Sequence, residues 1–190
     1  MPNVLTARRP LGRQEDEPLR THGSFAVVRL DERPLEPMFE LQFDVNDTAV
    51  AAALADATNF ELTAINRAVT SGEATALWLG PSNWLIKAGP ATVATLEHAV
   101  AMTRSSLLDV SDLWFGVSVA GPRSGDVLAK GCALDLHPLA PGATAVTQFV
   151  RMRALIRYVD AAPMYHMYVE RSFATYLWAW LVDAMTEFLD

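Results

Sequence analysis

ATALWLGPSNWLIKAG, residues 74–89, is the most informative segment of the chain. Two short apolar runs flank the turn-forming residues Gly80–Asn83, and this pattern predicts a β-hairpin. Gly89 is followed by Pro90, and because proline is favoured at the first position of a helix, we expect a helix to begin there. A hairpin that leads directly into a helix is typical of an antiparallel sheet covered by helices.

The preceding part of the chain supplies elements of the same kind. Apolar and β-branched runs predict strands at residues 24–30 and 38–45. Asn46 or Asp47 can cap a helix over residues 48–58, and a loop leads from that helix to the hairpin. The inner stripes expected for the first two helices are Val50 and Leu54 in one and Val93, Leu96, Val100 and Thr103 in the other.

The second half partly repeats this order. Residues 106–110 and 113–120 read as strands. Gly121-Pro122 then opens a helix, and Gly131 stands where a C-terminal cap belongs. The Gly-Pro helix starts in both halves indicate an internal duplication.

The C-terminal part contains two strand-like runs, at 147–160 and 164–170, and a last helix that Ser172 can cap. The stripe expected to face inward on this helix is Phe173, Leu177, Trp180, Leu181, Ala184 and Phe188, whereas Tyr176, Trp178 and Met185 lie off it. A helix that is apolar on more than one side is covered by core or by a partner. Candidate interface residues are therefore Phe173, Tyr176, Trp178 and Trp180.

These elements predict an α+β fold of two ferredoxin-like subdomains, with helices packed on antiparallel-rich sheets. We expect one globular unit over residues 24–190, with a division into 24–105 and 106–190 as the finer hypothesis. Residues 1–23 are rich in charge and proline, so we expect a flexible arm or an arm bound to a partner.

Composition narrows the class of function. Apolar residues make up 51% and charged residues 19% of the chain, which predicts a subunit that buries surface against another protein. The net charge of -7 argues against a nucleic-acid partner. The single cysteine fits a reducing cytoplasm, and no run approaches the roughly 20 apolar residues that a membrane-spanning helix needs.

Sequence motifs for chemistry are absent. Neither GxGxxG nor GxxxxGK[ST] occurs, so no nucleotide-binding loop is predicted. The four histidines, His22, His98, His137 and His166, show no metal-ligand spacing, and His166 is expected on an outward or interface position.

Residues 121–138, GPRSGDVLAKGCALDLHP, contain the groups that most resemble a site. Lys130 lies at the end of a helix, where it complements the helix dipole rather than binding phosphate. Cys132 is expected to be a packing residue whose helix-end position raises its thiol pKa. Asp135 and His137 could form a general-base pair, but an exit turn before a proline is the alternative that we favour.

Four segments resemble the γ subunit of heterotetrameric sarcosine oxidase. They are ALWLGPSNWLI (76–86), DVSD (109–112), AGPRSGDVLAKGCALDLHP (120–138) and RSFATYLWAWL (171–181), and Asn66-Arg67-Ala68 resembles a step before the first hairpin. The residues that carry the signature are Gly80, Pro81, Trp84, Gly121, Pro122, Lys130, Gly131, Cys132, Asp135, His137 and Pro138.

This resemblance implies a fold related to the folate-binding fold of the T-protein and other aminomethyltransferases. It implies a non-catalytic structural subunit of an αβγδ complex, with the α subunit as the main contact beside β and δ. FAD, FMN, NAD and tetrahydrofolate are implied for the complex and zinc for its δ subunit, with no catalytic, cofactor or metal residue in this chain. Such a complex oxidatively demethylates sarcosine to glycine, giving hydrogen peroxide and formaldehyde or 5,10-methylenetetrahydrofolate.

Three departures from the family pattern leave alternatives open. The hairpin lacks an acidic pair before Trp84, Ala133 stands where proline is expected, and residues 147–168 are unusual. These departures leave open a subunit of a related oxidase for another N-methyl or secondary amine. The relationship to T-proteins leaves open a second alternative, a stand-alone folate-binding protein like the aminomethyltransferases. A hydrolytic site at Asp135 and His137 is the third.

Overall fold

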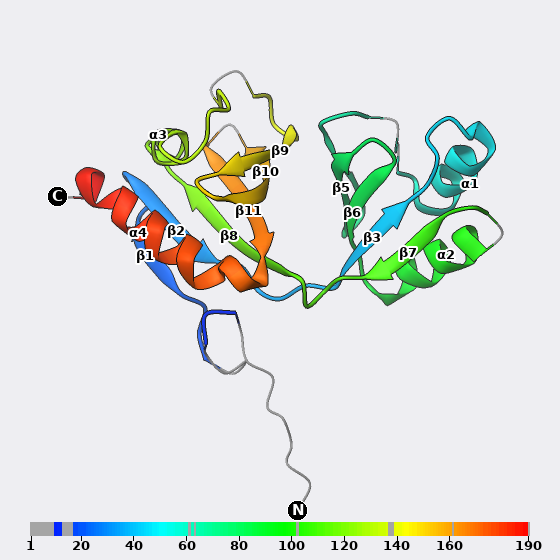
Figure 1. The fold of residues 1–190 in the computed structure, drawn as a ribbon, viewed down its shortest axis with the longest axis horizontal. Helices are drawn as coiled ribbons and strands as arrows, with labels where there is room; N and C mark the ends of the chain where they lie inside the picture. Colours follow the sequence, from blue (N-terminus) through cyan, green and yellow to red (C-terminus); the bar gives the residue numbers. More distant parts are fainter. Residues whose placement is uncertain are drawn as a thin grey trace, which may run out of the picture.

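Two antiparallel β-sheets stand side by side in the computed structural model (Figure 1). The structure describes residues 10–12, 17–60, 62, 64–101, 103–136, 139–160 and 162–189. Within these residues each sheet is covered by two helices on the face turned away from the other sheet. The predicted α+β class, with helices packed on antiparallel sheets, is confirmed.

The first sheet has the strand order β4-β5-β6-β3-β7 and packs against α1 and α2. Its elements are β3 (Met38–Gln42), α1 (Thr48–Thr58), β4 (Ala68–Ser71), β5 (Ala74–Gly80), β6 (Asn83–Lys87), α2 (Pro90–Ala101) and β7 (Ser106–Asp109). Without β4, which adds an edge strand, this order is the ferredoxin-like βαββαβ arrangement.

The second sheet has the order β1-β2-β8-β11-β10-β9 and packs against α3 and α4. Its elements are β1 (Thr21–Ser24), β2 (Val28–Glu32), β8 (Trp114–Ala120), α3 (Ser124–Ala129), β9 (Thr144–Phe149), β10 (Met152–Asp160), β11 (Met164–Glu170), a 3₁₀ turn η1 (Arg171–Phe173) and α4 (Ala174–Leu189). The order β9-β10-β11-β8-β2 repeats β4-β5-β6-β3-β7 element for element, with β1 added.

The second unit takes its closing strand from the N-terminal side of the chain. β2 precedes β3 in sequence, whereas its counterpart β7 follows α2. Two connections, 33–37 and 110–113, therefore cross between the sheets at the lower centre of Figure 1. The expected division into 24–105 and 106–190 does not follow the sheets, because β2 pairs with β8 and β7 pairs with β3.

Matching irregularities align the two units residue by residue. The β5–β6 hairpin has a register shift between Trp78 and Gly80, and the β10–β11 hairpin has one between Tyr158 and Asp160. Counting outward from the shifts makes Leu77 equivalent to Arg157, Trp84 to Tyr165, Leu85 to His166 and Lys87 to Tyr168.

Backbone hydrogen bonds support the same alignment. Arg67 and Ala143 form an isolated antiparallel bridge where the two units meet. The carbonyl of Arg67 accepts from the amide of Trp78 at 3.3 Å, and the carbonyl of Ala143 accepts from the amide of Tyr158 at 2.9 Å. The molecule is thus an approximate two-fold repeat about its centre.

Three hydrophobic clusters hold the described residues together. One lies between the first sheet and its helices, around Leu54 and Trp84, and another lies between the second sheet and its helices, around Val117 and Leu181. The third cluster joins the helix-free faces of the two sheets and contains Met38, Leu77, Leu79, Leu85, Val110, Trp114, Leu155 and Tyr168. Full burial of each such large side chain contributes about 1.5–3 kcal/mol, so this central cluster fixes the sheets against each other.

Local signals predicted several boundaries correctly. Asp47, rather than Asn46, caps α1, because its carboxylate accepts from the amides of Ala49 and Val50, both at 3.2 Å. α2 begins at Pro90 as predicted. The turn Pro81–Ser82 closes the predicted hairpin, with Gly80 opposite Asn83.

The expected N-terminal arm contributes structure to the second sheet. Thr21–Ser24 form β1, which pairs antiparallel with β2, and Leu11 is buried in the core of the second unit. The strand expected at 24–30 is in fact split by the turn between β1 and β2. Residues 1–9 and 13–16 lie outside the described residues.

Two further edge strands were missed. β4 lies in the segment expected to be a loop, and the run at 147–160 is two strands, β9 and β10, joined by a turn at Val150 and Arg151. Val150 has φ 53°, which a β-branched residue rarely adopts, so nothing in its chemistry indicates a turn.

Three details of the helices also differ from expectation. α3 begins at Ser124, after Pro122, since Gly121 and Pro122 form the turn that precedes it. Ser172 lies inside η1 and does not cap α4. The predicted inner stripe is right for Leu177, Leu181 and Ala184, which are buried, but Phe173 in η1 is 37% exposed and Met185, expected off the stripe, is fully buried.

Candidate functional site

The signature segment 120–136 forms a turn, a short helix and its exit, all packed against the second sheet. Gly121 has φ +106°, and a Cβ there would lie 2.8 Å from the carbonyl oxygen of Val27. Its amide donates to the carbonyl of Pro163 at 2.9 Å. A larger residue would separate β8 from the β1–β2 turn, so this glycine is required by packing and conformation together.

Lys130 connects the end of α3 to the end of α4. Its ammonium donates to the carbonyl of Ala184 at 2.7 Å, forms an ion pair with Glu187 at 2.8 Å and lies 4.6 Å from the ring centre of Phe188. The ion pair is exposed and contributes little, whereas the carbonyl contact links Lys130 to the last two turns of α4. Lys130 thus lies at the C-terminal cap of α3 and joins that helix end to α4.

Gly131 and Cys132 are packing residues. A Cβ at Gly131 would lie 2.4 Å from the ring of Phe149, so close approach, and not a left-handed cap, explains this glycine. Burial raises the pKa of the Cys132 thiol, which donates weakly to the carbonyl of Leu128 at 3.6 Å. The predicted direction of the pKa is right, although burial and not the helix end is the main cause. A protonated thiol is a poor nucleophile.

Only one member of the predicted Asp135–His137 pair lies among the residues that the structure describes. Asp135 is exposed in the irregular segment after α3, and Leu136 beside it is buried. His137 and Pro138 lie outside the described residues, so the general-base hypothesis and the exit turn stay predictions.

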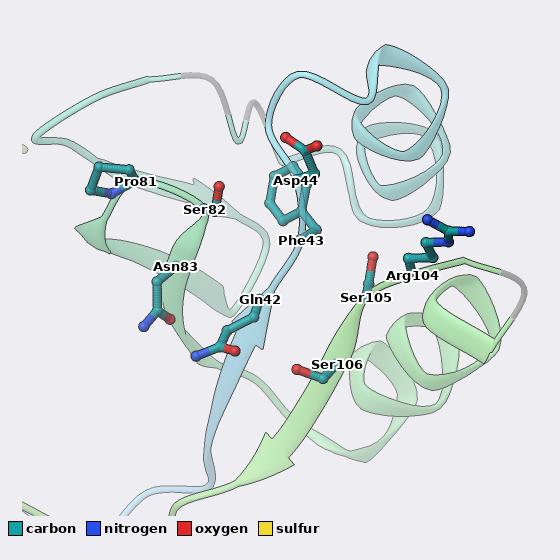
Figure 2. Close-up of a pocket in the computed structure, with 9 residues that line it drawn as sticks. All are labelled: Gln42, Phe43, Asp44, Pro81, Ser82, Asn83, Arg104, Ser105 and Ser106. Atoms are coloured by element: carbon teal, nitrogen blue, oxygen red, sulfur yellow. The ribbon is translucent and has the colours of Figure 1, made fainter.

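The tip of the first hairpin lines an open depression of about 520 Å³ (Figure 2). Its lining residues are Gln42, Phe43, Asp44, Pro81, Ser82, Asn83, Arg104, Ser105 and Ser106. Figure 2 shows these side chains spread around the rim rather than converging on one point. Asn83 Oδ1 and Ser105 Oγ are buried without a hydrogen-bond partner among the described residues.

This depression suits recognition better than catalysis. Its lining contains no histidine, cysteine or lysine, and the Asp44 carboxylate there accepts from the amide and side chain of Asn46 rather than from a serine hydroxyl of the lining. Pro81 is part of this lining, whereas Trp84 is 1% exposed in the core of the first unit. The signature tryptophan of the hairpin is therefore a packing residue.

The candidate interface residues of the last helix divide into two pairs. Phe173 and Tyr176 are 37% and 44% exposed. Trp178 and Trp180 are partly buried against the core of the second unit, and Trp180 meets the ring of Phe149 edge-on at 4.9 Å. The exposed pair remains available to a partner, whereas the tryptophans mainly complete the subunit's own core.

Sequence reasoning missed a cluster of charged and polar groups between the sheets. We call it the junction cluster; it consists of Arg33, Glu36, Lys87, Arg157, His166 and Tyr168. These residues come from a connection and from three strands, and no local spacing links them, so only the fold could reveal the cluster.

Burial and like charge shape the junction cluster. Burial, and then the cations Arg33, Arg157 and Lys87, lowers the pKa of His166 to about 3. Burial also lowers the pKa of Arg157 and raises that of Tyr168. His166 is therefore neutral at physiological pH, and its Nε2 accepts from Arg33 Nη1 at 2.9 Å.

Comparison with known proteins places the chain in a family. The model of the sarcosine oxidase gamma subunit family matches residues 42–187. The chain belongs to the sarcosine oxidase gamma subunit family. Two relatives, both sarcosine oxidase subunit gamma, come from Corynebacterium sp. strain U-96 (34% identity, covering 72% of this chain and 69% of the relative) and strain P-1 (33% identity, covering 59% and 57%).

Solved structures agree with this assignment. A chain of heterotetrameric sarcosine oxidase from Corynebacterium sp. U-96, solved in complex with pyrrole 2-carboxylate, matches with a TM-score of 0.80 at 27% identity over 88% of both chains. Aminomethyltransferase T of the glycine cleavage system from Bartonella henselae matches with a TM-score of 0.64 at 14% identity, over 83% of this chain and 46% of that one. The second likeness confirms the predicted aminomethyltransferase-like fold.

Neither a metal centre nor a membrane span is found in the part of the chain that the structure describes. No group of three or more His, Cys, Asp or Glu side chains there could hold a metal ion. No helix among these residues has the length and apolar character to cross a membrane.

Proposed function

We propose that this chain is a non-catalytic structural subunit of a heterotetrameric, flavin-dependent sarcosine oxidase. The observation that carries the proposal is the match to a chain of heterotetrameric sarcosine oxidase over 88% of both chains. The packing roles of Gly121, Gly131 and Cys132 support it, since the segment that most resembled a site builds the subunit instead.

The partners would be α, β and δ subunits, with α as the main contact. The exposed aromatic side chains of Phe173 and Tyr176 on η1 and α4 offer a surface for that contact, since aromatic residues are enriched at interfaces. We place FAD, FMN, NAD and tetrahydrofolate in the partner subunits and zinc in δ, because this sequence has no nucleotide-binding motif or metal-ligand spacing. A cytoplasmic location fits its single cysteine.

Co-expression with α, β and δ candidates from the same genome tests the proposal. We expect the full chain to co-purify in a four-subunit complex that oxidises sarcosine, and to be colourless and inactive alone. Replacement of Tyr176 by Ser should reduce its recovery in the complex, whereas Asp183→Asn, an exposed change on the same helix, should not.

Two outcomes would contradict this function. One is an active oxidase formed by the other subunits while the chain stays unbound. The other is a yellow, stable chain that oxidises sarcosine unaided. Tight binding of tetrahydrofolate by the isolated chain would favour the stand-alone folate-binding alternative, and turnover of another secondary amine would change the substrate but keep the assembly.

A further inference from the structure

The junction cluster contains more positive than negative charge. Arg33, Lys87 and Arg157 face one carboxylate, that of Glu36. Both oxygens of Glu36 are in use, since Arg33 lies 3.1 Å from one and Lys87 lies 2.7 Å from the other. This excess of cations stands out in a chain whose net charge is -7.

Arg157 is the unusual member of the cluster. Its side chain is half-buried, no hydrogen bond or ion pair joins it to another described residue, and its Nε is a buried donor without a partner among those residues. Buried guanidinium groups in proteins are normally paired, because the cost of removing a charge from water is large.

Further donors in the cluster also lack partners. The Nε of Arg33 and the Nδ1 of His166 are buried without hydrogen-bond partners among the described residues. Arg33 interacts with the hydroxyl oxygen of Tyr168, which lowers the pKa of Tyr168 against the larger effect of burial, but the O–H of Tyr168 has no acceptor among these residues. Because His166 is neutral and its Nε2 accepts from Arg33, its Nδ1 carries the proton and is a donor. Tyr168 is 1% exposed, so water reaches its side chain poorly.

The fold does not require these polar groups. Leu77 and Leu85 occupy the positions equivalent to Arg157 and His166 in the first unit, and both are fully buried in the central cluster. A cross-strand leucine pair is therefore sufficient for folding at these positions. The presence of Arg157 and His166 needs an explanation other than folding.

We propose that the junction cluster binds one carboxylate group, held by Arg157 with His166 and Tyr168 as further donors. A carboxylate supplies two acceptor oxygens and one negative charge, which match a guanidinium fork and offset part of the excess charge. The cluster reaches solvent through Arg33 and Lys87, whose side chains are 16% and 15% exposed.

The carboxylate has two sources. It is either a small carboxylate from solution or a side-chain or terminal carboxylate presented by another subunit. The second source rests on the proposed function, whereas the first does not, so the two are tested separately.

The first arm measures thermal unfolding of the full chain in sodium acetate and in sodium chloride at equal ionic strength. If the carboxylate is free, acetate raises the Tm of the wild type and of Arg153→Met, an exposed arginine on the same strand. Arg157→Met and Tyr168→Phe should lose this response.

A purely structural role is distinguished without acetate. Arg157→Met and Tyr168→Phe should then leave the Tm unchanged or raise it, because each removes a buried donor that lacks an acceptor. A fall in the Tm of both variants would overturn the proposal, as would equal protection of wild type and variants by acetate. Protection by chloride or phosphate as strong as that by acetate would also overturn it.

The second arm applies if acetate has no effect, and it measures binding of the chain to the other subunits. Arg157→Met should raise the Kd for assembly by about tenfold or more relative to Arg153→Met. Unchanged assembly together with no acetate effect overturns the carboxylate site. Wild-type chain that does not bind the other subunits overturns the proposed function, and the acetate arm alone then decides the site.

Discussion

The two units of the molecule share one architecture but differ in what they place on the central faces. At equivalent hairpin positions the first unit has Leu77 and Leu85, and the second has Arg157 and His166. The leucines contribute to the cluster that joins the sheets, whereas the polar pair leaves donors unpartnered among the described residues. The leucine pair shows that the repeated fold needs only apolar side chains at these positions. The polar pair of the second unit is therefore an addition that folding does not require.

The units also differ at the ends of their first strands. Phe43 and Gly121 are equivalent, because each amide donates to the carbonyl at a hairpin tip, at 3.1 Å to Ser82 and at 2.9 Å to Pro163. In the first unit this place borders the open depression of Figure 2. In the second unit the backbone around Val27 covers it. The additional β1–β2 segment therefore fills the position that the first unit leaves open.

Exchange of the central residues should give the largest effect. Leu77→Arg introduces a buried cation into the central cluster, and we expect a loss of about 3–5 kcal/mol in the free energy of unfolding, measured by urea denaturation. The control Leu77→Met keeps volume and apolar character and should cost less than about 1.5 kcal/mol. If the two variants lost equal amounts of unfolding free energy, a charge at position 77 would cost no more than an apolar residue, and the prediction would be wrong.

Acid should destabilise the folded chain through His166. In the folded chain the pKa of His166 is lowered from 6.5 to about 3. Below pH 6.5, His166 therefore binds a proton in the unfolded chain but not in the folded chain. Its contribution is present above pH 6.5, declines as pH falls and levels off near pH 3. Between pH 8 and pH 5 the loss is about 2 kcal/mol.

The measurement compares urea unfolding of wild type and His166→Leu at pH 8 and pH 5. The charged and titratable groups facing His166 are Arg33, Arg157, Lys87, Glu36 and Tyr168. Other carboxylates contribute equally to both proteins, so the variant should lose about 2 kcal/mol less than the wild type. Parallel pH dependences would show that His166 is not held neutral by the fold.

Local chemistry explains what the sequence could predict. The cap at Asp47, the helix start at Pro90 and the hairpin at Gly80–Asn83 each depend on residues close in sequence, and each prediction is confirmed. The edge strands β1 and β4 are short and poorly buried, so they lack the apolar alternation that indicates a strand.

The sequence indicated an internal repeat through a Gly-Pro pair at a predicted helix start in each half. The structure contains a repeat, but these two pairs are not at equivalent positions in it. Gly89-Pro90 precedes α2 and Gly121-Pro122 precedes α3, but the strand orders make α2 equivalent to α4 and α3 equivalent to α1. The Gly-Pro pairs are thus not related by the repeat. The junction cluster was unpredictable for a related reason, since contact between Arg33 and His166 exists only after both sheets have formed.

The smallest effect concerns the turns of the two edge hairpins. Gly72 (φ 57°) and Val150 (φ 53°) are the first residues of the β4–β5 and β9–β10 turns. A Cβ at Gly72 meets nothing within 4 Å, so Gly72→Val should cost only the left-handed conformation, about 1–2 kcal/mol in urea unfolding. Val150→Gly relieves the same strain but loses contacts with the core of the second unit, so we expect a change below about 1 kcal/mol. If Val150→Gly lost as much unfolding free energy as Gly72→Val, packing of the valine side chain, and not backbone strain, would decide the stability of the β9–β10 turn.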